Sequence, residues 1–367
     1  MNKINNILIC PLEWGLGHAT RMLPLASKLR DMNNNIFVGC GEEHLSLFRI
    51  ELPGVSYIKF QGFNPVYSHI LPQYIALVLK TPLLIFHIIR EHFRLKKIIL
   101  DYNINIVISD NRFGLWNRKI KTVYVTHMPL IPFPKALRSL EFIGVLLHRF
   151  IIKKYSLCFI PDLPGELNFS GRLSHGVKLP HNVRYIGILS RFISDKPASH
   201  ENSEIHYYNS VILSGPEPQR GILKQKLIYF LKDKKVMTAV FEGRPGDKTE
   251  IIRSGNFTFY NHLPSSEMRG ILTGSNKIIT RSGYTTIMDL IHLRCSALLI
   301  PTPGQPEQEY LAEYLAGKGW FYSVKQNELK EDIPKYSIIN LPSDEIIELS
   351  NVCLQNALEE LLEEPHI

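Results

Sequence analysis

The chain has 367 residues, of which 45% are hydrophobic and 21% are charged, and its formal net charge is +8. A chain of this length and composition can bury a large core, and we expect it to divide into two domains. Its 5 cysteines show no paired spacing, which argues against a disulfide framework and a zinc site and fits a reducing cytosol.

Short apolar runs of strand length alternate with longer segments that are compatible with helices. The first series of predicted strands comprises Ile7–Cys10, Ile36–Val38, Ile106–Ile108, Val123–Val125 and Leu157–Ile160. The second series comprises Val211–Leu213, Val236–Phe241, Phe257–Tyr260, Ile278–Thr280 and Leu298–Ile300. This alternation predicts an α/β protein with two doubly wound, Rossmann-like domains that face each other across a cleft.

The domain boundary is predicted from composition. A stretch rich in Ser, Asp, Lys and Pro separates the two series of strands, as is typical of a linker. We therefore expect an N-terminal domain over 1–190, a linker over 191–206 and a C-terminal domain over 207–342. The last segment, 343–367, is expected to form a helix that packs back on the N-terminal domain.

The loop that follows the first predicted strand carries a histidine directly after two glycines. Gly15 and Gly17 are in the turn, and His18 follows them. A segment that is compatible with a helix begins at Met22. Ligands bind at the carboxyl ends of parallel strands, where helix N-termini point at them. Because histidine titrates near neutrality, His18 is a candidate general base, although a structural turn histidine is the alternative.

A second junction of the same kind lies in the C-terminal half. The sequence Arg-Ser-Gly-Tyr-Thr-Thr at 281–286 follows a predicted strand and leads into a helix. Gly283 permits a tight turn, and the free N–H groups of the helix start suit a diphosphate. Ser, Gly and Thr are also ordinary helix-capping residues, so a purely structural role is the alternative. The next strand ends in a proline-rich loop at 301–310, where amide and carboxylate side chains suit a hydroxyl-rich ligand.

These two stretches resemble the donor signature of nucleotide-sugar-dependent glycosyltransferases of the GT-B fold. The resemblance is to family 28, which includes the peptidoglycan N-acetylglucosaminyltransferase, and more distantly to family 1. It covers roughly 205–325 and the N-terminal glycine loop. It implies that Ser282, Gly283 and Thr285 hold the diphosphate, and that Asp289 stands where the family has a ribose-binding glutamate.

The same resemblance implies further donor contacts. Gln308 and Glu309 are expected at the sugar and ribose, and a loop with His262 and Leu263 is expected at the nucleobase. The loop after the first strand of this domain is expected near the phosphates, and its candidate residues are Ser214, Gly215 and Arg220. This loop has fewer glycines than the family pattern, and Asp289 is one methylene shorter than the family's glutamate.

For the N-terminal half, the resemblance implies that His18 deprotonates the acceptor hydroxyl. Asp110 lies at the end of the strand predicted at 106–108, where family-1 relatives place the carboxylate that holds the base. Ser-Asp-Asn is also a common turn sequence, so a structural role for Asp110 is the alternative. The candidate acceptor-binding residues are Gly15, Gly17, Arg112 and His127. No cofactor and no metal are expected, since no His, Cys and Asp cluster has metal-ligand spacing.

Basic residues in the N-terminal half lie within or beside very apolar stretches, notably 70–100 and 140–152. Such segments are typical of helices that lie on an anionic membrane surface, and a buried helix with a solvated basic end is the alternative. No stretch reaches the roughly 18 uncharged apolar residues of a membrane span, and the apolar run after Met1 is too short for a signal peptide. We expect a cytoplasmic protein at the inner face of the plasma membrane and no nucleic-acid partner, because no recognition motif accompanies the basic stretches.

The sequence thus predicts an inverting glycosyltransferase that uses a nucleotide sugar, expected to be UDP-linked, and a hydroxyl acceptor such as a lipid-linked or cell-envelope glycan. Two alternatives remain open at this point. A nucleotide-sugar 2-epimerase shares the architecture, and a non-catalytic subunit that binds a nucleotide sugar or recruits a partner to the membrane would bind the donor without turnover.

Overall fold

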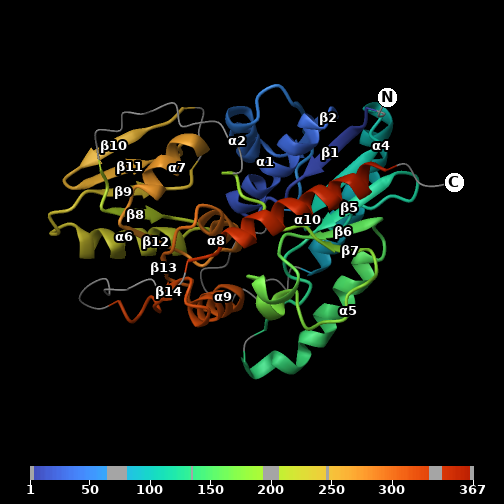
Figure 1. Cartoon of the computed structure of the whole chain (residues 1–367). Helices are drawn as coiled ribbons and strands as arrows, with labels where there is room; N and C mark the ends of the chain where they lie inside the picture. The colour runs from blue at the N-terminus through green and yellow to red at the C-terminus, as the bar shows by residue number, and fades with distance from the viewer. Residues whose placement is uncertain are drawn as a thin grey trace.

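The computed structural model describes residues 4–63, 81–133, 135–192, 206–244, 248–329 and 341–363. In these residues two sheets, each with helices against it, form the two halves of the chain (Figure 1). The predicted fold class is confirmed. The predicted linker is outside this description except at its ends, and the apolar stretch that begins at 70 is described only from 81.

The first sheet has the order β3-β2-β1-β4-β5-β6-β7, and each of its pairings is parallel. Its strands are β1 (Asn6–Cys10), β2 (Asn35–Cys40), β3 (Ser56–Lys59), β4 (Ile106–Asp110), β5 (Lys121–Val125), β6 (Leu157–Ile160) and β7 (Val183–Tyr185). From β1 the chain first adds β2 and β3 on one side and then β4 to β7 on the other side, so the strand order reverses between β1 and β4. A ligand cleft is expected outside the carboxyl ends of the strands at such a point.

The second sheet has the order β10-β11-β9-β8-β12-β13-β14, in which the edge pair β10 and β11 is antiparallel. Its strands are β8 (Asn209–Ile212), β9 (Thr238–Phe241), β10 (Ile251–Ser254), β11 (Phe257–Tyr260), β12 (Lys277–Thr280), β13 (Leu298–Leu299) and β14 (Tyr322–Ser323). All ten predicted strands are present with small shifts of their ends. The four that were not predicted are β3, β7, β10 and β14, which are short edge or near-edge strands without a continuous apolar run.

Helices fill the connections between the strands. In the first half they are α1 (Leu16–Asp31), α2 (Glu42–Glu51), α4 (Thr81–Asp101) and α5 (Glu141–Ile152). In the second half they are α6 (Gln219–Leu231), α7 (Ser265–Thr273), α8 (Tyr284–His292) and α9 (Pro306–Gly317). The apolar side chains of α1 and α2 pack in one large core, whereas α4 and α5 pack against β1, β4, β5 and β6 in two smaller clusters.

The last helix, α10 (Asp344–Leu362), runs back along the N-terminal half (Figure 1). Its Glu360 pairs with Arg184 on β7 at 2.7 Å, and the Ser350 hydroxyl accepts a hydrogen bond from the amide of Ile188. Gly187 lies so close to Ser350 that an added Cβ would come within 2.5 Å of its Cα. The first sheet ends at β7 and the second begins at β8. The final helix therefore packs against the half of the chain that contains the first sheet.

Candidate active site

A cavity of about 570 Å³ lies between the two halves of the chain. It is lined by the loops that follow β1, β8, β9, β11, β12 and β13, which are carboxyl ends of strands in both sheets. The predicted site residues that line it are His18, Gly15, Gly17, His127, Ser214, Gly215, Arg220, His262, Leu263, Gly283, Thr285, Asp289 and Gln308.

The N-terminal wall of the cavity is formed by the turn between β1 and α1. Gly15 has φ 80°, a left-handed conformation that favours glycine, and it directly precedes the helix. The sequence predicted His18 in a loop before the helix. In the structure it lies in the first turn of α1. Gly17 contacts the other domain, because the Thr285 hydroxyl donates a hydrogen bond to its carbonyl at 3.0 Å.

His18 and Asp110 are brought together as predicted. His18 Nδ1 lies 3.0 Å from Asp110 Oδ2, and the two side chains are 17% and 0% exposed. Asp110 is the last residue of β4, which pairs with β1, so both side chains leave the sheet at the same edge. Nε2 of His18 has no hydrogen-bond partner among the described residues, and His18 lines the cavity.

Arg21, which was not predicted as a site residue, completes this cluster. Its guanidinium is buried and bonds Asp110 through Nε at 2.9 Å and through Nη2. Nη2 also lies 2.8 Å from His18 Nδ1, and Nη1 lies 3.0 Å from His127 Nδ1. Arg21 is three residues after His18 on one helix, a spacing that places the two side chains on the same face and could have revealed it.

The charges of the cluster shift the protonation equilibria of its members. Burial raises the pKa of Asp110, but Arg21 and His18 outweigh it and lower that pKa to about 2. Burial, and then the positive charge of Arg21, lower the pKa of His18 from 6.5 despite the opposing effect of Asp110. His18 is therefore neutral at physiological pH and able to accept a proton.

His127 connects the cluster to the opposite domain. It follows β5 and stacks on Tyr284 of α8 with ring centroids 4.2 Å apart. Its Nε2 lies 2.9 Å from Oε1 of Glu307, which is in the first turn of α9. Burial raises the pKa of Glu307, while the two histidines and Arg21 lower it, with a net shift below 4.5. Glu307 lies in the proline-rich segment 301–310 but was not predicted as a site residue.

The C-terminal wall is formed by the start of α8 and the loop after β8. Gly283 precedes α8, and no side chain caps the free N–H groups of this helix end. Gly283, Thr285 and Thr286 at this helix start line the cavity. Arg220 lines it as well, held by Glu217 at 3.1 Å. An uncapped helix N-terminus beside an arginine is an electropositive site that suits phosphate groups.

Four predicted donor residues are placed differently from expectation. Ser282 is buried outside the cavity lining, and its hydroxyl donates to the carbonyl of Gln308 at 2.8 Å. Gln308 Oε1 accepts from the amide of Thr302. Glu309 is exposed and does not line the cavity, since on α9 it is two residues past Glu307, which faces the opposite domain.

Asp289, the fourth, lines the cavity but is already bonded. It accepts hydrogen bonds from the Ser190 hydroxyl at 2.7 Å and from the amide of Arg191, and it pairs with the Arg191 guanidinium at 3.4 Å. Burial raises its pKa above 3.8. The aspartate thus fastens the end of the N-terminal half to α8.

Arg112 was predicted to bind the acceptor, and the structure corrects this. The side chain is 1% exposed, pairs with Glu91 at 3.2 Å and donates to the carbonyls of Gly39 and Phe60. It lies outside the cavity lining, on the face of the sheet that α4 covers. A guanidinium so surrounded stabilises the packing of α4 and is not available to an acceptor.

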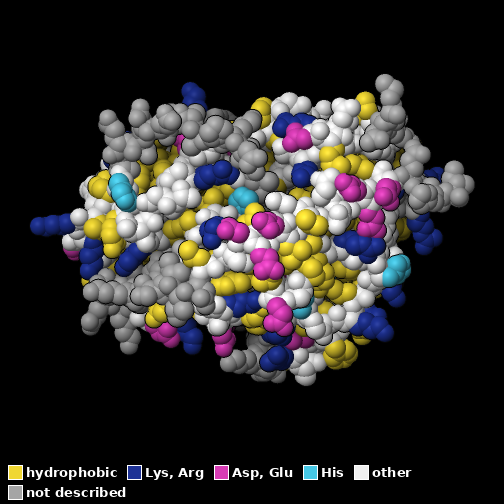
Figure 2. All heavy atoms as spheres, viewed as in Figure 1, with side chains coloured by type: hydrophobic (Ala, Val, Ile, Leu, Met, Phe, Trp, Pro, Cys, Tyr) yellow, Lys and Arg dark blue, Asp and Glu magenta, His cyan; other side chains and the backbone are white. Residues whose placement is uncertain are grey.

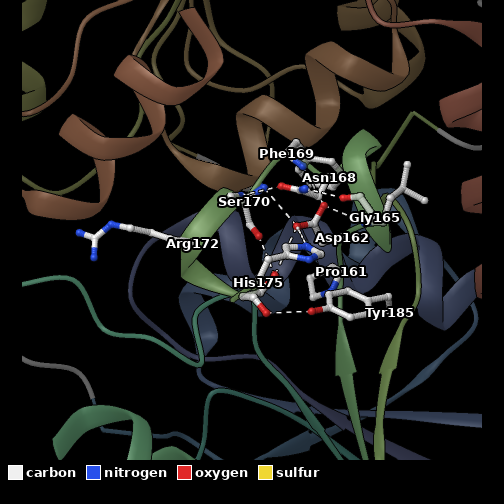
Figure 3. Close-up of polar contacts among 12 residues, drawn as sticks. Pro161, Asp162, Gly165, Asn168, Phe169, Ser170, Arg172, His175 and Tyr185 are labelled. Carbon is white, nitrogen blue, oxygen red and sulfur yellow. Dashed lines mark hydrogen bonds and ion pairs between the residues drawn. The ribbon is translucent and has the colours of Figure 1, made fainter. Parts of the chain in front are cut away.

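A loop after β6 also connects the two domains. The buried Asp162 accepts hydrogen bonds from the amides of Phe169 and Ser170, and from His175 Nε2 at 3.1 Å (Figure 3). The loop that it organises contacts α8 and α9, because Tyr284 donates to the carbonyl of Pro161 at 2.7 Å. Three further contacts join the same surfaces: Arg172 N to Tyr310 Oη, Tyr314 Oη to Asn168 Oδ1, and Lys318 Nζ to the Glu166 carbonyl.

Among the described residues no group of three or more His, Cys, Asp or Glu side chains is arranged to hold a metal ion. Over the same residues, no helix combines the length and apolar character that crossing a bilayer requires.

Comparison with known proteins supports the resemblance. Residues 224–338 match the family described as glycosyltransferase family 28 C-terminal domain. No curated protein sequence matches the chain. Solved structures of low sequence identity share the fold: the glycotransferase of kitacinnamycin has a TM-score of 0.64 at 12% identity and covers 99% of this chain and 100% of its own.

Two further structures have the same architecture. The calicheamicin glycosyltransferase CalG4 has a TM-score of 0.59 at 11% identity, over 97% of this chain and 95% of its own. The glycosyltransferase SnogD from Streptomyces nogalater has a TM-score of 0.54 at 14% identity, over 98% and 94%. The fold is therefore GT-B, and the matched domain together with this fold supports a glycosyltransferase of family-28 type.

Proposed function

Because the chain carries a family-28 C-terminal domain within a GT-B fold, we propose that it is an inverting glycosyltransferase. It moves a sugar from a nucleotide sugar, UDP-linked in our proposal, to a hydroxyl group of a lipid-linked or cell-envelope glycan. The observation that carries this proposal is His18, a neutral imidazole with Asp110 at one ring nitrogen and the interdomain cavity at the other.

On the donor side, the diphosphate would lie at the start of α8. The uncapped N–H groups of this helix, the Thr285 hydroxyl and Arg220 supply hydrogen-bond donors and positive charge. The loop at Ser214 and Gly215 borders the same space. Donors that are already in place stabilise the negative charge that develops on the leaving diphosphate without reorganisation during the reaction.

On the acceptor side, His18 Nε2 takes the proton of the attacking hydroxyl. The acceptor oxygen forms a bond to the anomeric carbon on the face opposite the diphosphate, and the bond from that carbon to the phosphate oxygen breaks. The nucleoside diphosphate leaves with the electron pair, so the configuration at the anomeric carbon inverts. The resulting imidazolium is stabilised by the Asp110 carboxylate.

An exposed apolar face suggests a lipid-linked acceptor. In α4 the side chains of Phe86 and Phe93 are 59% and 64% exposed, and in α5 those of Phe142 and Phe150 are 58% and 59% exposed. The two helices pack on the same face of the first sheet. These exposed side chains favour the membrane-surface interpretation of the two segments over the alternative of buried helices.

Basic side chains accompany this face. Lys96 lies over the Phe93 ring at 5.0 Å, and Lys154 lies over the rings of Trp116 and Phe150 at 5.1 and 4.5 Å. Over α5, hydrophobic side chains and Lys or Arg side chains lie next to one another on the surface (Figure 2). An apolar surface rimmed by cations is the composition that binds anionic lipid surfaces.

The apolar face is connected to the cavity. His87 of α4 packs on the ring of Phe63 at 5.1 Å, and the Phe63 carbonyl accepts a hydrogen bond from Trp14, which lines the cavity. A lipid-linked acceptor held at the membrane surface by α4 would thus present its sugar close to the turn that carries His18.

A two-stage experiment tests the proposed activity. A thermal-shift screen with nucleotide sugars first finds the donor that stabilises the protein, and release of its nucleotide is then measured with and without extracts of lipid-linked and envelope glycans. We expect acceptor-dependent release. Conversion of the donor to its C2 epimer without an acceptor would instead show an epimerase, and binding without turnover a non-catalytic subunit.

Membrane binding is tested separately by flotation with vesicles. Wild-type protein is expected to float with phosphatidylglycerol-containing vesicles and not with pure phosphatidylcholine vesicles. The variant Phe86→Ser/Phe93→Ser should lose binding, whereas the control Tyr229→Ser, an exposed aromatic on α6, should retain it. Equal flotation of both variants would contradict the assignment of the α4 face.

A further inference from the structure

Arg21 contacts His18, Asp110 and His127, and His127 in turn contacts Glu307 of the opposite domain. We propose that Arg21 is a positioning residue that fixes which ring nitrogen of His127 carries the proton and keeps His18 uncharged until it accepts the acceptor proton. The part of this inference that concerns proton acceptance rests on the proposed function. The part that concerns the ring proton of His127 and the charge of His18 rests on the contacts of Arg21 and on burial, and it requires no transfer activity.

The geometry determines the tautomer of His127. A guanidinium has only hydrogen-bond donors, so Nδ1 of His127, 3.0 Å from Arg21 Nη1, must be the acceptor. The ring proton of the neutral imidazole is then on Nε2, which donates it to Glu307 Oε1 at 2.9 Å. Arg21 thus orients His127 so that it donates a hydrogen bond across the cavity to α9.

For His18 the decisive feature is that Arg21 neutralises Asp110. The guanidinium bonds both carboxylate oxygens, and its Nη2 lies 2.8 Å from His18 Nδ1. In the base form that we propose, Nδ1–H donates to Asp110 Oδ2 at 3.0 Å, so the contact with Nη2 sets two donors side by side and is not a hydrogen bond. A carboxylate that is already paired stabilises an imidazolium less than a free one, and the nearby positive charge disfavours it directly. Asp110 can therefore orient the ring without holding it in the charged form.

The other charged and titratable groups near His18 come from several elements. They are Asp110 on β4, His127 after β5, His44 on α2, and Glu307 on α9. Of the four, the two carboxylates favour a charged His18. Arg21 is the cation that opposes them, and it is 1% exposed, so solvent screens it little.

The experiment is a pH titration of the imidazole nitrogens by NMR on protein labelled with ¹⁵N-histidine. Signals of His18 and His127 are assigned with the variants His18→Asn and His127→Asn. In the wild type we expect His127 in the Nε2–H tautomer and a His18 titration midpoint below 6.5, because burial and Arg21 lower its pKa. A wild-type His127 with its proton on Nδ1 would overturn the proposal before any Arg21 variant is made.

Three variants then separate charge from position. Arg21→Gln removes the charge and should move the His18 midpoint to higher pH. Arg21→Lys keeps the charge but not the forked donor set, so the midpoint should move less while His127 loses its single tautomer. Arg30→Gln, on the same helix but bonded to the Pro53 carbonyl at the surface, is the control and should change neither signal.

An unchanged His18 midpoint in folded Arg21→Gln would refute the proposal. The titration needs no donor and no turnover, so a failure of the proposed transfer activity would leave its result intact. Conversely, a confirmed transferase with an unmoved His18 midpoint would retain its function and exclude only the role of Arg21.

Discussion

The Thr285 hydroxyl donates a hydrogen bond to the carbonyl of Gly17 at 3.0 Å, so the start of α8 in one domain touches the start of α1 in the other. An added Cβ at Gly17 would lie 3.1 Å from Thr285 Oγ1. Glycine is therefore needed here for close approach of two domains and not for backbone conformation. The contact sets the distance between the proposed base and the proposed diphosphate site.

Replacing Gly17 with alanine should accordingly separate stability from activity. Alanine favours the helix by about 1 kcal/mol relative to glycine, so the free energy of unfolding should not fall. Displacement of α8 from α1 should lower kcat/KM for sugar transfer, by up to about a hundredfold if the reacting groups move by 1 Å. The control is Gly270→Ala in α7, where an added Cβ meets nothing within 4 Å. Equal activity of both variants would contradict this.

Asp110 should make folding stability depend on acid pH. Its pKa is lowered from 3.8 to about 2 in the folded protein, so its contribution is complete above the unfolded value and is lost as pH falls towards about 2. Asp110→Asn should remove this dependence and lower the free energy of unfolding by about 3–5 kcal/mol at neutral pH, since it leaves Arg21 buried without a counter-charge. Urea unfolding at a series of pH values measures both effects, and parallel pH curves for variant and wild type would contradict them.

The fold and the proximity of His18 to Asp110 could be predicted because both follow from local patterns. Apolar runs mark the central strands, and the carboxyl ends of parallel strands converge on one edge, so His18 after β1 and Asp110 at the end of β4 meet. The short edge strands β10 and β14 were not predicted, because an exposed strand and a two-residue strand have no continuous run of apolar residues.

Other parts of the site depend on contacts that the sequence does not encode locally. Arg112 follows Asp110 closely, yet its side chain turns to the opposite face of the sheet and pairs with Glu91. Glu307 and Glu309 differ only in their phase on α9, and a shift of two residues decides which carboxylate reaches His127. The spacing of Arg21 from His18 on α1 indicates only that the two share a helix face; its other partners, Asp110 and His127, come from β4 and from the loop after β5.

The two glutamates of α9 provide a matched pair of variants. Glu307→Ala leaves Nε2–H of His127 without its partner, which should lower stability by about 1–3 kcal/mol. Transfer activity should fall by roughly tenfold or more, because His127 lies next to Arg21 and a displaced His127 would disturb the geometry of the reacting groups. Glu309→Ala changes an exposed residue outside the cavity lining and should leave activity near the wild-type value. A larger loss of activity in Glu309→Ala than in Glu307→Ala would restore the sequence-based assignment.

The central claim is that His18 removes the proton of the acceptor hydroxyl. The measurement that tests it most directly compares single-turnover sugar transfer by wild type and His18→Ala, with the donor affinity of both determined by calorimetry. We predict that His18→Ala binds the nucleotide sugar as tightly as the wild type and transfers the sugar about 10²–10⁴ times more slowly. Transfer at the wild-type rate by folded, donor-saturated His18→Ala would contradict the account.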